Sequence, residues 1–224
     1  MGENGGRAMM TLQNRWWHTR MRWSERFQKL RHAISPSRLR VVTYSWPLRV
    51  AVCPCDADLC DFLRDRQLRS RSIFHFGSGG HHLVGVRNLA DGLDNDVLAI
   101  TLAPSELRTY VDRVVRDPAL ARHYKVLFAD IHSLDSRTLP MFDIVTLFHL
   151  GEFGDEASAA RRVDDAAVLE LFISRLAPRG LMLFYPHSFA YAKVTPLIDQ
   201  AVARRQLEFV ENVRSLSVYR RVAG

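Results

Sequence analysis

Apolar positions follow two different spacings along most of the chain, and the alternation between them predicts a series of strands and helices. Short apolar runs bounded by turn residues are typical of strands, whereas apolar residues at steps of three and four are typical of helices. The expected strands are 72–76, 97–102, 125–129, 143–150, 180–185, 207–212 and 216–222, with a further short one at Leu48–Cys53. The expected helices are 57–67, 81–93, 105–116, 164–176 and 190–204.

The order of these elements predicts an α/β fold. Strands that alternate with helices form right-handed βαβ units and a parallel sheet covered on both faces. The last two strands are joined only through Val213–Ser215, so they must be antiparallel. We therefore expect a doubly wound, mostly parallel, seven-stranded sheet of the Rossmann-like kind that ends in an antiparallel hairpin. It would occupy residues 57–224 and follow an extension formed by residues 1–56.

The extension contains an amphipathic stretch at residues 15–34. Six residues recur there at steps of three and four, which predicts a helix with an apolar stripe. They are Trp16, Arg20, Trp23, Phe27, Leu30 and Ile34. We interpret this helix as packing on the domain behind it. A basic helix on a membrane surface, a nucleic-acid-binding arm and an organelle-targeting segment are the alternatives.

Charge separates the extension from the domain. The 224 residues carry a net charge of +7. Residues 1–49 hold ten Arg or Lys against two Glu, a net of +8, whereas residues 50–224 hold 21 basic and 22 acidic residues, a net of −1. A nearly neutral domain does not predict a nucleic-acid partner. Any acidic partner, whether a membrane or a protein, is expected to bind residues 15–34.

Three clustered cysteines, Cys53, Cys55 and Cys60, bear on compartment and on metals. An odd, clustered set does not form a disulfide framework and suits a reducing compartment. No apolar run reaches the ~18–20 residues of a membrane span, and the N-terminus lacks the apolar segment of a secretory signal. We expect a cytoplasmic protein, with peripheral membrane attachment as the alternative. A zinc site from these cysteines lacks a clear fourth ligand, so no metal is expected.

A glycine-containing loop follows the first strand of the domain. It reads Gly77-Ser78-Gly79 and precedes a predicted helix. In open parallel sheets, ligands bind at the carboxyl ends of the strands. Glycine allows a ligand to approach the backbone closely. This loop is therefore the predicted binding site.

Five segments around this loop share a pattern with a known family. They are IFHFGSGG (73–80), AITLAPSEL (99–107), LFADIHSLD (127–135), FDIVTLFHLGEF (142–153) and LAPRGLMLFY (176–185). In this order, and with the closing hairpin, they resemble the class I S-adenosylmethionine (SAM)-dependent methyltransferases over residues 57–222. The resemblance implies that SAM is the cofactor. It also implies that Asp130 contacts the adenine amine and that Ile131 covers the adenine ring.

The chain departs from the family pattern at three positions. His75 stands where the family usually has an acid, and His81 replaces the third glycine of the loop. Thr101 stands where an Asp or Glu binds both ribose hydroxyls, and a neutral hydroxyl is a weaker partner than a carboxylate. The resemblance thus implies an altered cofactor site. Its members are His75, Gly77, Ser78, Gly79, Thr101, Asp130 and Ile131.

Histidines are frequent at the carboxyl ends of the predicted strands. Histidine titrates near neutrality and serves as a base, a hydrogen-bond donor or a metal ligand. The histidines at this edge are His75, His81, His82, His132, His149 and His187. We take His149, Glu152 and His187 as the candidate proton acceptors. The alternatives are separate loop residues without a shared role, or a divalent metal held by two or three histidines.

These features support three functions. The first is a SAM-dependent methyltransferase that acts on a small molecule. The second is a methyltransferase-like scaffold that has lost its cofactor and binds a partner. The third is a nicotinamide-dependent oxidoreductase, in which the third glycine of the loop motif would fall at His82. Cys53-Pro54-Cys55 precedes the first main strand, so it does not match the Pro-Cys nucleophile of DNA cytosine methyltransferases.

Overall fold

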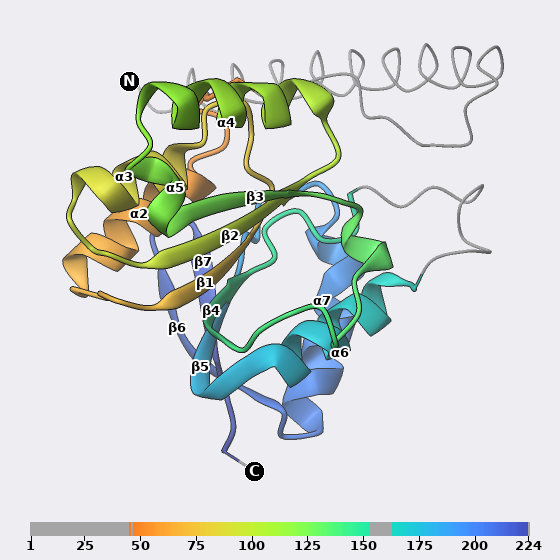
Figure 1. Ribbon diagram of the computed structural model, residues 1–224. Coiled ribbons are helices and arrows are strands. Elements are labelled where there is room, and N and C mark those ends of the chain that lie inside the picture. Colours follow the sequence, from red (N-terminus) through yellow and green to blue (C-terminus); the bar gives the residue numbers. More distant parts are fainter. Residues whose placement is uncertain (1–44, 46, 153–162, 224) are drawn as a thin grey trace, which may run out of the picture. The chain divides into compact units, whose positions relative to one another are not determined.

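A seven-stranded sheet forms the centre of the computed structural model, which describes residues 45, 47–152 and 163–223 (Figure 1). The strand order is β3-β2-β1-β4-β5-β7-β6. β1 to β5 are mutually parallel, whereas β7 is antiparallel to both of its neighbours. The strands are β1 (Ser72–Phe76), β2 (Asp96–Thr101), β3 (Tyr124–Phe128), β4 (Phe142–Thr146), β5 (Leu176–Phe184), β6 (Leu207–Val213) and β7 (Leu216–Arg221). The predicted fold class is confirmed.

Helices cover both faces of this sheet (Figure 1). The elements α2 to α5 lie on one face, and α6 and α7 lie on the other. The helices are α2 (Cys55–Asp65), α3 (Leu83–Ala90), α4 (Pro104–Arg116), α5 (Leu120–His123), α6 (Asp165–Arg175) and α7 (Tyr191–Ala203), with a 3-10 helix, η1 (Ile131–Ser133). Within these described ranges, no helix combines the length and apolarity of a membrane span.

Strand residues alternate between two apolar cores, one on each face. Phe74 of β1 packs on Phe172 of α6, with ring centroids 4.2 Å apart. Its neighbour Ile73 belongs to the opposite core, together with Leu59 of α2. Successive strand side chains point to opposite faces, so a strand covered on both sides is apolar at nearly every position. This accounts for the continuous apolar runs in the sequence.

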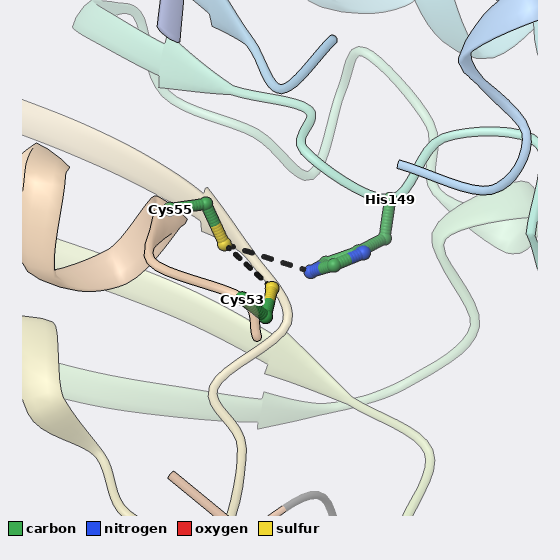
Figure 2. Close-up of side chains that lie close together, drawn as sticks. All are labelled: Cys53, Cys55 and His149. Carbon is green, nitrogen blue, oxygen red and sulfur yellow. Dashed lines mark hydrogen bonds between the residues drawn. The ribbon is translucent and has the colours of Figure 1, made fainter. Parts of the chain in front are cut away.

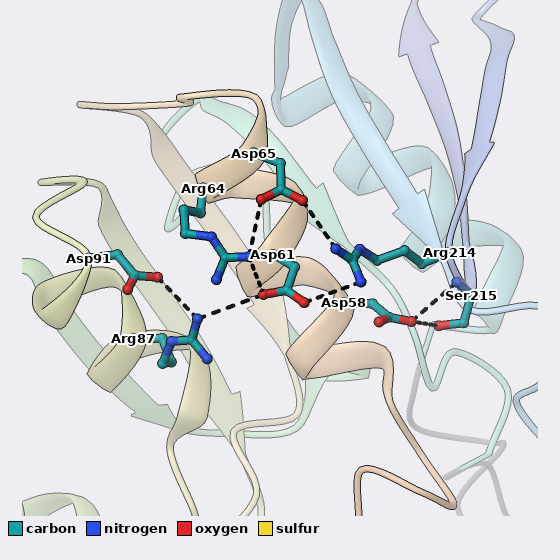
Figure 3. A network of polar contacts seen from close by, with 8 residues as sticks. All are labelled: Asp58, Asp61, Arg64, Asp65, Arg87, Asp91, Arg214 and Ser215. Carbon is teal, nitrogen blue, oxygen red and sulfur yellow. Dashed lines mark hydrogen bonds and ion pairs between the residues drawn. The ribbon is translucent and has the colours of Figure 1, made fainter.

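A polar network connects α2 with α3 and with the β6–β7 turn (Figure 3). Arg214 in the turn contacts Asp61 at 3.3 Å and Asp65 at 3.1 Å. Asp58, in the first turn of α2, accepts hydrogen bonds from the backbone N–H and the hydroxyl of Ser215. These contacts hold α2, from Asp58 in its first turn to Asp65 at its end, against the closing hairpin.

The structure corrects several predicted boundaries in the first half of the chain. The strand expected at Leu48–Cys53 is wrong, because the chain turns there and the N–H groups of Val52 and Cys53 donate to the carbonyl of Arg49. The helix expected from residue 81 begins at Leu83, since His82 adopts a left-handed conformation with φ of 51°. Neither α5 nor η1 was predicted, because each is too short to show a periodicity.

The expected helix at 15–34 lies outside the described residues, and the division into 1–56 and 57–224 stays a prediction. The strand expected over 143–150 ends at Thr146, and residues 147–151 leave the sheet in a turn that carries His149. β5 begins earlier than expected, at Leu176.

Candidate functional site

The loop between β1 and α3 has the backbone conformation that the glycine pattern predicts. Gly77 has a φ of 96° and Gly79 a φ of 54°, both in the region that residues with a Cβ atom rarely occupy. Ser78, between them, is almost completely buried. A Cβ atom on Gly79 would collide with the ring of His81, and one on Gly80 would lie 2.5 Å from the hydroxyl of Ser45. Two side chains of this chain therefore cover the second half of the loop.

A carboxylate stands beside the end of β2, although the strand itself ends in Thr101. Glu106, in the first turn of α4, accepts a hydrogen bond from the Thr101 hydroxyl at 2.6 Å. It also accepts bonds from Ser78 at 3.4 Å and from Ser45 at 3.1 Å. Its side chain is buried, with 5% exposure. A buried carboxylate from the following helix thus lies next to the residue that ends β2.

His75 lies inside the sheet. Its Nδ1 atom is 2.8 Å from the Thr146 hydroxyl, and its Nε2 atom is 3.6 Å from a carboxylate oxygen of Asp56. Burial lowers the pKa of His75 to about 3, and burial raises the pKa of Asp56 to about 6. A charged form is costly in such surroundings, so His75 is neutral at physiological pH.

Asp130 and Ile131 follow β3, as the resemblance implies. Ile131 is buried in the core beneath α6. Asp130 accepts from the backbone N–H of His132 at 3.1 Å and caps η1. The His132 ring bridges Asp130 and Asp165 of α6 at 3.2 and 3.0 Å. Hydrogen bonds to Asp130 and Asp165 raise the pKa of His132 to about 9, so this histidine is an ionic link between η1 and α6.

His149 and Glu152 are in direct contact beyond the end of β4. The His149 Nδ1 atom donates to Glu152 at 3.2 Å, and Glu152 also accepts from the Ser188 hydroxyl and the Phe189 N–H. These hydrogen bonds, with that of His149 foremost, outweigh burial and lower the pKa of the Glu152 carboxyl. The third candidate, His187, is exposed; its ring is 5.6 Å from Tyr185, whose ring is 6.4 Å from His149.

The other edge of the His149 ring faces two cysteines that precede and begin α2 (Figure 2). The Cys55 sulfur lies 3.4 Å from the Cys53 sulfur and 3.9 Å from the His149 Nε2 atom. The hydrogen bond from Cys55 lowers the pKa of Cys53 to about 5, and the same bond raises the pKa of Cys55. Burial opposes the charge on His149, but hydrogen bonds to Cys53 and Glu152 raise its pKa to about 10. At neutral pH His149 therefore carries a proton, and it acts as a base only after losing it.

Three contributors to this region escaped prediction from the sequence. Asp56 and the Cys53–Cys55 pair come from a segment that was assigned to the extension. Glu106 lies in a segment used for the resemblance, and an acid in the first turn of a helix was the available signal. An acid in the first turn of a helix does not by itself show which strand end its side chain reaches.

Comparisons with known proteins agree on the fold. No protein-family model matches the chain, and no curated protein sequence matches it. Solved structures do match. An N-methyltransferase, NodS, from Bradyrhizobium japonicum WM9 in complex with S-adenosyl-L-homocysteine is 14% identical, with a TM-score of 0.53 over 78% of this chain and 91% of that chain.

Two further structures show the same likeness. Magnesium protoporphyrin IX methyltransferase from Synechocystis PCC 6803 with bound SAM is 13% identical, with a TM-score of 0.51 over 75% of this chain and 78% of that chain. A putative SAM-dependent methyltransferase from Methanococcus maripaludis is 10% identical, with a TM-score of 0.54 over 76% of this chain and 86% of that chain. At such low identity the likeness concerns architecture. This chain has the fold of the class I SAM-dependent methyltransferases.

Proposed function

We propose that this protein is a SAM-dependent methyltransferase that acts on a small-molecule acceptor. The observation that carries the proposal is the buried carboxylate of Glu106, which lies at the end of β2 and within hydrogen-bonding distance of Ser78 in the glycine loop. A carboxylate is the group suited to accept hydrogen bonds from two ribose hydroxyls. In this proposal Glu106 takes the ribose-binding role that Thr101 cannot fill, and it exchanges its hydrogen bonds with Ser78 and Ser45 for the ribose hydroxyls.

The residues around the loop fit the remaining parts of SAM. Gly77 lets the loop turn tightly with a φ of 96°, and a Cβ atom there would be in van der Waals contact with His149 Cδ2 at 3.6 Å, so His149 borders this part of the loop. Asp130 and Ile131 follow the end of β3, where the resemblance implies the adenine. His81 and Ser45 cover Gly79 and Gly80 only with side-chain atoms, which a change of rotamer displaces.

SAM supplies an activated methyl group on a sulfonium, and the protein would contribute mainly by positioning the acceptor. His149, Glu152 and His187 remain the candidate proton acceptors. In the resting protein His149 is protonated and Glu152 accepts three hydrogen bonds, so an acceptor that arrives already deprotonated suits this site best. The nearly balanced charge of residues 50–224 supports a small molecule over a polyanion.

A second function, that of a scaffold without a cofactor, draws on a different observation. The side chains of His81 and Ser45 fill the space where Cβ atoms on Gly79 and Gly80 would lie. In a scaffold these contacts would be permanent. The nicotinamide-dependent alternative has less support, because the matching structures reported above are methyltransferases.

Isothermal titration calorimetry of the full chain with SAM and with S-adenosyl-L-homocysteine tests the first proposal. We expect both to bind with micromolar dissociation constants and each to displace the other. If neither binds at millimolar concentration, the methyltransferase proposal fails and the scaffold is favoured. Binding of NADH in place of both would support the oxidoreductase.

A further inference from the structure

Three side chains that could each give one ligand atom to a metal converge beside the glycine loop (Figure 2). Cys53 and Cys55 come from the start of α2, and His149 comes from the turn after β4. Their two sulfurs and the His149 ring nitrogen all lie within 4.8 Å of one another. In the described portion of the chain, this is the one such group of three found among His, Cys, Asp and Glu.

Two of the separations between these atoms are close to those of ligands around zinc. Tetrahedral zinc with Zn–S bonds of about 2.3 Å and Zn–N bonds of about 2.0–2.1 Å places two sulfurs about 3.8 Å apart and a sulfur and a nitrogen about 3.5 Å apart. The observed values are 3.4 Å between the sulfurs and 3.9 Å between Cys55 Sγ and His149 Nε2. Shifts of a few tenths of an ångström would bring these two distances to the zinc values, and the third pair, Cys53 Sγ and His149 Nε2, lies within 4.8 Å.

Glu152 orients the imidazole for this role. Its carboxylate accepts a hydrogen bond from His149 Nδ1, which leaves Nε2 toward the sulfurs. A carboxylate behind a metal-binding histidine sets the tautomer and raises the basicity of the ligand nitrogen. Glu152 is itself held by Ser188 at 2.6 Å and by the Phe189 N–H at 3.2 Å. Glu152, held by Ser188 and the Phe189 N–H, is thus already placed to orient a metal-binding histidine.

We propose that Cys53, Cys55 and His149 bind a zinc ion and leave one coordination position open. Thiolates are soft ligands and imidazole suits zinc, whereas magnesium and calcium prefer oxygen ligands, so this set selects zinc over them. Three protein ligands with an open fourth position are typical of catalytic rather than structural zinc. The site borders the glycine loop, because His149 Cδ2 lies 3.6 Å from where a Cβ of Gly77 would be.

The sequence alone directed attention to a different set of ligands. It offered only Cys53, Cys55 and Cys60, which lack a clear fourth ligand, and so no metal was expected. Cys60 is buried in the apolar core beneath α2, and it is not part of the cluster. The third ligand instead lies 94 residues from Cys55. Zinc binding here does not depend on the proposed methyltransferase function, but with zinc bound the Nε2 atom of His149 is coordinated and His149 does not serve as a proton acceptor.

Zinc titration of the chelator-treated full chain, kept reduced and in competition with a chromogenic chelator, tests the proposal. We expect one zinc ion per chain, bound more tightly than by the competing chelator. Cobalt(II) in its place should give the intense near-ultraviolet absorption of thiolate-to-cobalt charge transfer. Zinc should also protect Cys53 and Cys55 of the wild-type chain from alkylation, as read by mass spectrometry.

Variants assign the ligands. Cys53→Ser and Cys55→Ser should each weaken zinc binding strongly and reduce the cobalt absorption. Glu152→Gln should weaken zinc binding about 10- to 100-fold, the usual effect of removing an outer partner of a metal ligand. Cys60→Ser is the matched control and should bind zinc like the wild type. The proposal is overturned if the wild type binds no zinc at micromolar concentration, if Cys60→Ser binds zinc as weakly as Cys53→Ser, or if only copper(I) is retained.

Discussion

The Thr101 hydroxyl donates a 2.6 Å hydrogen bond to Glu106, so a carboxylate from α4 lies where β2 ends in a neutral residue. Strand and helix are adjacent in the chain, and Pro104 at the first position of α4 starts the helix directly after the strand. The first turn of α4 thereby brings its acid back to the strand end. This arrangement underlies the first prediction.

Glu106→Gln should weaken the binding of S-adenosyl-L-homocysteine about 10- to 100-fold, because a hydrogen bond to a charged group contributes about 1.5–3 kcal/mol. Glutamine keeps the size of the side chain but loses the charge. Calorimetry measures the dissociation constants. Glu208→Gln, at an exposed acid paired with Arg220 on the β6–β7 hairpin, is the control and should bind like the wild type. Unchanged binding by Glu106→Gln would remove Glu106 from the cofactor site.

His132 should make the stability of the protein depend on pH. Its hydrogen bonds with Asp130 and Asp165 raise its pKa to about 9 from an ordinary value of 6.5. The protonated, hydrogen-bonded His132 ring stabilises the folded state fully below pH 6.5. This stabilisation is lost as the pH rises through the folded-state pKa of about 9. The free energy of unfolding of His132→Gln should therefore differ most from that of the wild type near pH 6.

Urea denaturation of both proteins between pH 6 and pH 10 measures this difference. Comparing the two curves removes the contributions of other titrating groups, since both proteins share them. A difference that stays constant across this range, or that grows toward alkaline pH, would contradict the assigned ionic link.

The network around α2 allows two kinds of polar contact to be compared. Arg214→Ala should lower the free energy of unfolding by less than about 1 kcal/mol, because its partners Asp61 and Asp65 are partly exposed. Asp58→Ala should cost about 1–3 kcal/mol, since it leaves the N–H and hydroxyl of Ser215 without their acceptor.

Salt separates the two effects. In 1 M NaCl the screening length falls to about 3 Å, so the cost of Arg214→Ala should shrink while that of Asp58→Ala should persist. Urea denaturation at low and high salt provides the measurement. Equal salt sensitivity of the two variants would show that Asp58 acts mainly through its charge.

Gly85 in α3 permits close packing against Tyr124 of β3. A Cβ atom at this position would overlap the tyrosine ring, which is buried and whose hydroxyl lies 2.9 Å from His82. Gly85→Ala should therefore destabilise the protein by about 1–3 kcal/mol despite the better helix propensity of alanine. Gln200→Ala, at an exposed position of α7, is the control and should stay within about 0.5 kcal/mol of the wild type in urea denaturation.

Local spacing in the sequence was sufficient to predict the type and order of the main elements. The nearly continuous apolar run that begins in β4 indicated a strand buried on both faces, and the short connection before Leu216 required an antiparallel closing pair. Errors arose where a local interaction shifted the boundary of an element. The left-handed conformation of His82, for example, delays the start of α3.

The tertiary structure alone decided which side chains meet. Cys55 reaches His149 across 94 residues because β1 and β4 are neighbours in the sheet and α2 begins beside their carboxyl ends. Periodicity depends on neighbours along the chain, whereas a site depends on strand order and on where each helix starts. The sequence by itself therefore determined the fold and the glycine loop, and only the packed chain brought Glu106 to Thr101 and two cysteines to His149.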